Sequence, residues 1–125
     1  MAKILVIEDE KNLRHLYKQD LEIDGHEVVT AETAEEGLQK MESEGPDLVI
    51  LDIRMPGMDG LEAMGLILDR HPKIPVVLNS AYSSYKDNFL SWAADAYIIK
   101  SADTTELRGK VRELLAARSD SEEPR

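Results

Sequence analysis

Residues 48–52 have the sequence Leu-Val-Ile-Leu-Asp, in which four apolar residues are followed by a carboxylate. A continuous apolar run of this length, rich in branched side chains, is typical of a parallel strand that is covered on both faces. Other such runs occupy residues 4–7, 76–78 and 97–99, and a weaker one occupies residues 28–31. The sequence therefore predicts five strands, of which the weakest suits an edge of the sheet.

Segments with helical periodicity separate these runs, because their apolar residues recur every three or four positions. The apolar stripes are Leu13, Leu16, Tyr17 and Leu21; Ala34, Leu38 and Met41; Leu61, Met64 and Leu68; and Leu107, Val111, Leu114 and Leu115. A further helix is expected over residues 84–93, and Thr33 and Asp59 are expected as N-caps. Strands and helices then alternate five times, which predicts a doubly wound α/β domain with a parallel sheet.

Length and composition limit the possible classes of protein. The chain is expected to form one domain over residues 1–118, followed by a disordered tail or the start of a linker at residues 119–125. The net charge of −10 would repel a phosphate backbone, so direct nucleic-acid binding is not expected. No apolar stretch approaches the roughly 20 residues that a membrane-spanning helix needs. Because the sequence also has no cysteine, a cytoplasmic protein is the simplest interpretation.

Polar side chains follow four of the predicted strands, at the point where each strand ends. Glu8 and Asp9 follow the first run, Asp52 the third, Ser80 the fourth and Lys100 the fifth. In an open parallel α/β sheet, ligands bind at the carboxyl ends of the strands, where the winding direction reverses. With the flavodoxin-like strand order 2-1-3-4-5, the first and third strands are neighbours, so the three carboxylates are expected to share one concavity.

This set of groups favours phosphoryl chemistry. Three clustered carboxylates repel one another, and an all-oxygen site favours a hard cation such as Mg²⁺. Lys100 and the Ser80 hydroxyl add donors for phosphoryl oxygens, and a carboxylate oxygen of Asp52 can act as an in-line nucleophile. Since phosphoryl transfer needs mainly positioning and charge neutralisation, the sequence predicts an aspartyl phosphate.

With these motifs in this order, the chain resembles the receiver domains of two-component response regulators over about residues 3–117. The carriers of the resemblance are Glu8-Asp9, Asp52 within the segment Leu51–Gly60, Ser80-Ala81, and Tyr97 three residues before Lys100. The loop that follows Asp52 is the most specific of these motifs. The resemblance implies a flavodoxin-like (βα)5 fold, the fold of the chemotaxis receiver that is a standard example of this strand order.

The resemblance also implies roles for the site residues. Asp52 would be the phosphoacceptor, Asp9 would bind Mg²⁺ directly, and Glu8 would orient a metal-bound water. The backbone carbonyl of Arg54 would be the remaining protein ligand, besides Asp52 itself, and Lys100 would contact the phosphoryl group.

A second group of residues would transmit the signal. Ser80 would move toward the phosphoryl group, and Tyr97 would rotate into the space that Ser80 vacates. This would change the surface formed by the expected helix at 84–93, the following strand and the last helix. By the same resemblance, Arg54 and Tyr82 would tune the lifetime of the phosphate, and Tyr82 would hinder the attacking water.

On this resemblance the protein accepts a phosphoryl group from a histidine kinase or a histidine phosphotransfer protein, and signals to a downstream protein or output domain. It would catalyse only its own phosphorylation and dephosphorylation, so it is not expected to be an enzyme. Three residues depart from the family pattern: Ser101 stands where proline commonly follows the lysine, Asn79 where an apolar residue is usual, and Ala94 where glycine often ends a helix.

Three alternatives differ from this interpretation in testable ways. A receiver-like interaction module that works without phosphorylation is compatible with the three departures. A phosphatase of the haloacid dehalogenase type needs a second acid two residues after its nucleophile, where Arg54 stands. A flavodoxin would need a Gly-rich phosphate cradle after the first strand, where Glu8 and Asp9 would instead repel the phosphate of the cofactor.

Overall fold

The computed structural model describes residues 2–81 and 93–122. They form a five-stranded parallel sheet in the order β2-β1-β3-β4-β5, which confirms the predicted topology. The elements are β1 (Lys3–Ile7), α1 (Lys11–Ile23), β2 (Glu27–Ala31), α2 (Ala34–Glu44), β3 (Leu48–Leu51), α3 (Gly60–Arg70), β4 (Val76–Ser80), β5 (Ala96–Ile99) and α4 (Thr105–Glu122). The helix expected over residues 84–93 falls, up to residue 92, outside the described residues.

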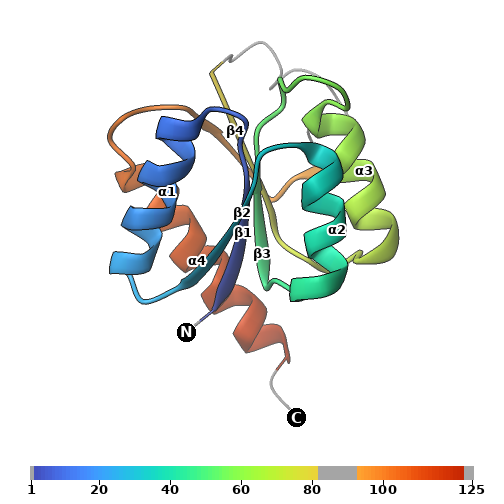
Figure 1. The fold of residues 1–125 in the computed structure, drawn as a ribbon. Helices are drawn as coiled ribbons and strands as arrows, with labels where there is room; N and C mark the ends of the chain where they lie inside the picture. Colours follow the sequence, from blue (N-terminus) through green and yellow to red (C-terminus); the bar gives the residue numbers. More distant parts are fainter. Residues whose placement is uncertain (1, 82–92, 123–125) are drawn as a thin grey trace.

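Helices cover both faces of the sheet, with α1 and α4 on one face and α2 and α3 on the other (Figure 1). Consecutive side chains of a strand point to opposite faces, so one strand contributes to both layers. In β1, Ile4 and Val6 belong to the core around Tyr17 of α1, whereas Leu5 and Ile7 belong to the core beneath α2 and α3. This two-sided burial explains the continuous apolar runs at residues 4–7, 48–51 and 76–78, which lie within the three central strands.

The register of the sheet places the ends of β1 and β3 level with one another. Ile7 pairs with Leu51, so the residues that follow, Glu8 and Asp52, leave the sheet side by side. The Asp52 amide donates to the Ile7 carbonyl at 3.1 Å, and the Glu8 amide donates to the Ala31 carbonyl at 3.0 Å. These two hydrogen bonds continue the parallel ladder by one step and hold the backbone of both acidic residues.

Local capping fixes where α2 and α3 begin. The Thr33 hydroxyl accepts a hydrogen bond from the Glu36 amide at 3.1 Å, and the Asp59 carboxylate accepts one from the Glu62 amide at 2.9 Å. Both N-caps agree with the sequence-based prediction. Asp59 therefore ends the loop after Asp52 at a defined position.

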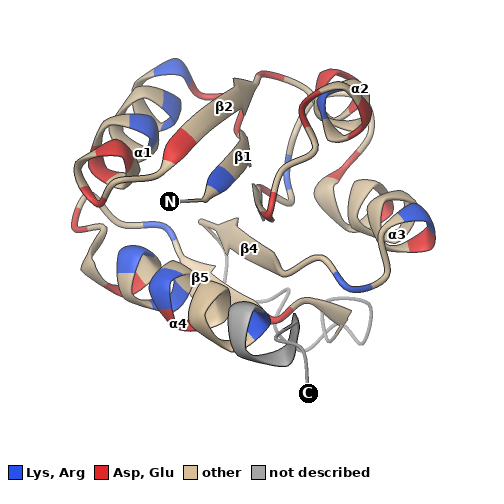
Figure 2. Cartoon of the chain, turned by 90° about the horizontal axis from the view of Figure 1, so that it is seen from below, with Lys and Arg blue, Asp and Glu red and all other residues tan. Residues whose placement is uncertain are grey.

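The last helix is longer than the sequence suggested. α4 runs to Glu122, so residues 119–122, expected as part of a disordered tail or linker, are helical. Basic residues recur along this helix (Figure 2). One of them, Arg108, forms a two-pronged ion pair with Asp24 beyond the end of α1, with Nε and Nη2 at 2.9 and 2.6 Å from the carboxylate oxygens. This pair ties α4 to α1.

Candidate functional site

The carboxyl edge of the sheet gathers three acidic side chains from two neighbouring strands. Glu8 and Asp9 follow β1 and Asp52 follows β3, and one carboxylate oxygen from each lies within 4.8 Å of the others. Glu8 and Asp52 are only 2% and 4% exposed, whereas Asp9 is exposed to solvent. The acidic cluster predicted from the strand ends is therefore present, with one open side.

Lys100 reaches this cluster from the end of β5. Its Nζ lies 2.8 Å from Glu8 Oε1 and 3.1 Å from Asp52 Oδ2, so one ammonium bridges the two buried carboxylates. Its backbone amide donates to the Ser80 carbonyl at 2.8 Å, which holds Lys100 beside the end of β4. The Lys100–Ser101 peptide bond is trans. Serine after the lysine thus leaves the ammonium inside the acidic cluster.

Burial sets the protonation behaviour of the three paired groups. It raises the pKa of Glu8 to about 7, although hydrogen bonds from Lys100 and the Glu10 amide oppose the rise. Burial also raises the pKa of Asp52, against the opposing charge and hydrogen bond of Lys100, and the neighbouring Asp9 adds to the rise. For Lys100, burial acts to lower the pKa, but the bond to Glu8 and the charge of Asp52 outweigh it, so the pKa is raised. The ammonium of Lys100 therefore stays charged. For Glu8 and Asp52, burial makes the ionised form less favourable than it is in water.

The donor set of the cluster fits Mg²⁺. Glu8, Asp9 and Asp52 offer oxygen ligands, which hard divalent cations prefer. When all three carboxylates are ionised, one ammonium leaves two negative charges uncompensated, which is the charge that a divalent cation supplies. Mg²⁺ keeps several of its waters, and the solvent-exposed side at Asp9 leaves room for them.

The loop after Asp52 folds back tightly against the end of β3. The Gly60 amide donates to the Ile53 carbonyl at 2.7 Å. A Cβ atom at Gly60 would collide with the Asp52 carbonyl and with the Ile53 Cα, both of which are backbone atoms. Glycine is therefore required at residue 60 by close approach, and this contact fixes the backbone of Asp52 from the side of α3.

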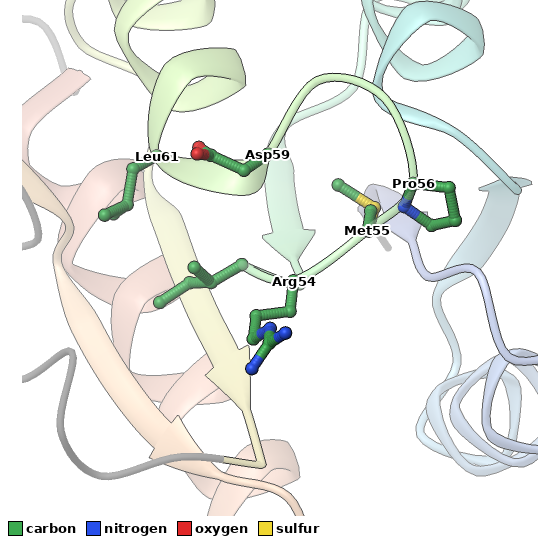
Figure 3. Close-up of a pocket in the computed structure, with 6 residues that line it drawn as sticks. Arg54, Met55, Pro56, Asp59 and Leu61 are labelled. Carbon is green, nitrogen blue, oxygen red and sulfur yellow. The ribbon is translucent and has the colours of Figure 1, made fainter.

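A polar pocket of about 650 Å³ lies along the same loop. Figure 3 shows Arg54 projecting past the end of β3, while Asp59 and Leu61 lie at the start of α3. Met55 and Pro56 line the pocket from the turn that connects Arg54 to Asp59. Arg54 is exposed, so its side chain stands at the rim of the site and not inside the acidic cluster.

The two predicted switch residues lie on one face of the sheet. Ser80, at the end of β4, is fully buried. Tyr97 of β5 pairs with Leu78, and it packs partly buried against the core beneath α2 and α3. Since residues 78 and 80 share a face of β4, Ser80 and Tyr97 lie on that face as neighbours along the two strands. Tyr82, the second residue predicted to tune the phosphate lifetime, lies outside the described residues.

Arg14 contacts the site, and sequence reasoning missed it. It is only 7% exposed, and its guanidinium donates to the carbonyls of Glu8 and Asp9. The signal was available, because Arg14 precedes Tyr17 by three residues and Tyr17 precedes Leu21 by four, a spacing that places all three on one buried helix face. A charged residue next to an apolar helix face is usually expected to be exposed to solvent, so the burial of Arg14 was not predicted.

Asn79, the polar residue that departs from the family pattern, is 2% exposed and directly precedes Ser80 in β4. It is close enough to Tyr17 to oppose the rise that burial causes in the pKa of that phenol. Among the residues that the structure describes, however, neither Tyr17 Oη nor Asn79 Nδ2 has a hydrogen-bond partner. Tyr17 and Asn79 are therefore neighbouring buried polar groups that lie between the sheet and α1.

Comparison with known proteins places this chain in a family. A family model described as the response regulator receiver domain matches residues 4–112. The chain therefore belongs to the receiver domain family of two-component response regulators, as its motifs indicated. Across residues 2–81 and 93–122, no helix is long and apolar enough to cross a membrane.

The curated relatives FleR and PhoP are regulators longer than this chain. FleR of Pseudomonas aeruginosa is 43% identical over 83 residues, 66% of this chain and 18% of FleR. The alkaline phosphatase synthesis transcriptional regulatory protein PhoP of Bacillus subtilis is 34% identical over 115 residues, 90% of this chain and 48% of PhoP. This chain thus spans about half of PhoP and less of FleR.

Two solved structures share the fold and have a higher sequence identity to this chain than FleR and PhoP have. The response regulator TrrA of Thermotoga maritima, in complex with Mg²⁺-BeF, is 47% identical with a TM-score of 0.88, over 91% of this chain and 99% of TrrA. TrrA in complex with the histidine kinase ThkA is 48% identical with a TM-score of 0.86, over 92% of this chain and 99% of TrrA.

Proposed function

We propose that this receiver accepts a phosphoryl group on Asp52 from a histidine kinase or a histidine phosphotransfer protein, in a reaction that requires Mg²⁺. The observation that carries the proposal is the bridge of Lys100 between Glu8 and Asp52, beside the open carboxylate of Asp9. In the reaction, a carboxylate oxygen of Asp52 forms a bond to phosphorus while the bond between phosphorus and the donor imidazole breaks. The imidazole leaves with the electron pair of that bond.

Each group at the edge of the sheet has a role in this transfer. Asp52, Asp9 and the backbone carbonyl of Arg54 would hold Mg²⁺, and Glu8 would hold it through a water. The bound cation would supply charge neutralisation for the phosphoryl oxygens. Lys100 can leave Glu8 for a phosphoryl oxygen, because both are anionic acceptors within reach of one flexible side chain.

The signal would pass from Ser80 to Tyr97 across the face that they share. Reorientation of these two side chains would favour one of two packings of the surface around β5 and α4, a population shift caused by one added charge. A downstream protein or an output domain would recognise that surface. The complex of TrrA with ThkA supports a histidine kinase as the phosphodonor. A cytoplasmic location is part of this proposal.

Intact-mass measurement tests the proposal directly. The protein is incubated with Mg²⁺ and acetyl phosphate, beside an Asp52→Asn variant and a sample with EDTA. The expected result is one added phosphoryl group in the wild type with Mg²⁺ and none in either control. A wild type that stays unmodified, and whose fluorescence does not respond to beryllofluoride, would favour an interaction module that works without phosphorylation.

A further inference from the structure

We propose that Arg14 is a positioning residue for the Mg²⁺ site, an inference that rests on the proposed function. The side chain of Arg14 is 9% exposed, which is unusual for a group that is always charged. Its Nη1 donates to the Glu8 carbonyl at 2.9 Å and to the Asp9 carbonyl at 3.3 Å, and its Nη2 lies 3.2 Å from Glu32 Oε1. One guanidinium thus joins α1, the loop after β1 and the loop after β2.

The two carbonyls belong to the residues whose carboxylates form the metal site. Holding both carbonyls sets the orientation of the backbone from which the two side chains leave. The loop is closed from the other side as well, because the Glu10 amide donates to Glu8 Oε2 at 3.1 Å and the Arg14 amide donates to the Glu10 carbonyl at 2.9 Å. Among these contacts, the guanidinium is the one that reaches Glu8 and Asp9 together.

A simple charge-balancing role would not explain this geometry. The carboxylate that pairs with Arg14 belongs to Glu32, whose side chain is 70% exposed, and such pairs contribute little because water screens them. The carbonyl contacts, in contrast, are made by buried or partly buried groups. Nη1 donates to both carbonyls while Nη2 pairs with Glu32, and a planar guanidinium can hold these contacts at once through two nitrogens, which a single ammonium nitrogen does not provide.

The two roles predict opposite effects on Mg²⁺ affinity. If Arg14 acts only as a nearby positive charge, its removal reduces repulsion and strengthens Mg²⁺ binding. If Arg14 positions the loop, its removal lets Glu8 and Asp9 leave their shared geometry and weakens binding. Loss of a group that orients metal ligands typically lowers affinity by about 10- to 100-fold.

Calorimetric titration of Mg²⁺ into the wild type, Arg14→Met and Arg14→Lys separates these roles. Methionine keeps an apolar stem of similar length without the donors. The matched control is Arg108→Met, which removes an equally well-paired arginine between α1 and α4, away from the loop. We expect Arg14→Met to raise the Mg²⁺ Kd about 10-fold, Arg14→Lys to raise it less, and Arg108→Met to leave it unchanged.

An Arg14→Met variant that binds Mg²⁺ as tightly as the wild type, or more tightly, would overturn the inference. If Arg14→Met does not fold, Arg14→Lys decides alone, since a raised Kd supports positioning and a wild-type Kd contradicts it. A wild type that binds no Mg²⁺ would first refute the proposed function, and the inference with it. If the wild type binds Mg²⁺ and Arg14→Met binds it with the same Kd, the result refutes the inference about Arg14 and leaves the proposed function standing.

Discussion

Replacing Glu8 by glutamine should remove much of the pH dependence of stability in the Mg²⁺-free protein. Burial raises the pKa of Glu8 from 4.5 to about 7. Because the folded state favours the protonated form, its stabilising contribution is complete below the unfolded pKa and is lost as the pH rises through the folded one. The difference between 4.5 and about 7 corresponds to about 3 kcal/mol of unfolding free energy, at about 1.4 kcal/mol for each pKa unit.

Glutamine matches the shape of Glu8 and does not titrate. It has one acceptor oxygen, so it can keep either the bond from Lys100 Nζ or the bond from the Glu10 amide, which reach different oxygens of Glu8. The lost hydrogen bond lowers stability at every pH by a similar amount. The difference in stability between variant and wild type, followed across pH, therefore isolates the charge.

Urea denaturation followed by circular dichroism, in EDTA, measures this difference at pH 5 and pH 8. We expect the stability of Glu8→Gln relative to wild type to rise by about 2–3 kcal/mol between these two pH values. The control is Glu32→Gln, because the Glu32 side chain is 70% exposed and its removal should give no comparable trend. A constant difference between Glu8→Gln and wild type across pH would refute the argument from burial.

Three further changes test other parts of the account. Asn79→Leu should raise the free energy of unfolding by about 1–3 kcal/mol, because it removes a buried amide donor that has no partner in the described part of the chain. A lower stability of this variant in urea denaturation would contradict the prediction. Gly60→Ala should lower the free energy of unfolding by about 1–3 kcal/mol, because the new Cβ would collide with the Asp52 carbonyl. The control Gly65→Ala, at an open position of α3, should raise it slightly. Equal effects of the two variants in thermal unfolding would argue against the close approach at Gly60. Lys100→Met should slow phosphorylation by acetyl phosphate about 100-fold in an intact-mass time course, and an unchanged rate would exclude phosphoryl contact by Lys100.

The fold could be predicted because its signals are local and redundant. Four continuous apolar runs marked buried parallel strands, and the weaker run at residues 28–31 became β2, at one edge of the sheet. The polar residues that end the strands, Glu8, Asp52 and Lys100, followed from the same pattern. Once the strand order is fixed, their proximity follows from the register of β1 against β3 and of β5 against β3 through β4.

The remaining features depend on three-dimensional detail that periodicity does not contain. Arg14 lies on a buried helix face, where its donors are used by backbone carbonyls that no sequence pattern specifies. The role of Gly60 comes from close approach of two backbone segments, which a capping motif at Asp59 does not reveal. The upward shift in the pKa of Glu8 arises from the degree of burial, and residue type alone cannot give it.

Chemical mapping of the phosphorylated residue tests the central claim most directly. After reaction with acetyl phosphate and Mg²⁺, borohydride reduces an aspartyl phosphate to homoserine, and peptide mass spectrometry locates that residue. The account predicts homoserine at position 52, and its absence when Mg²⁺ is withheld. Homoserine at position 9, or none at any position in a folded sample, would contradict the assignment of Asp52 as the phosphoacceptor.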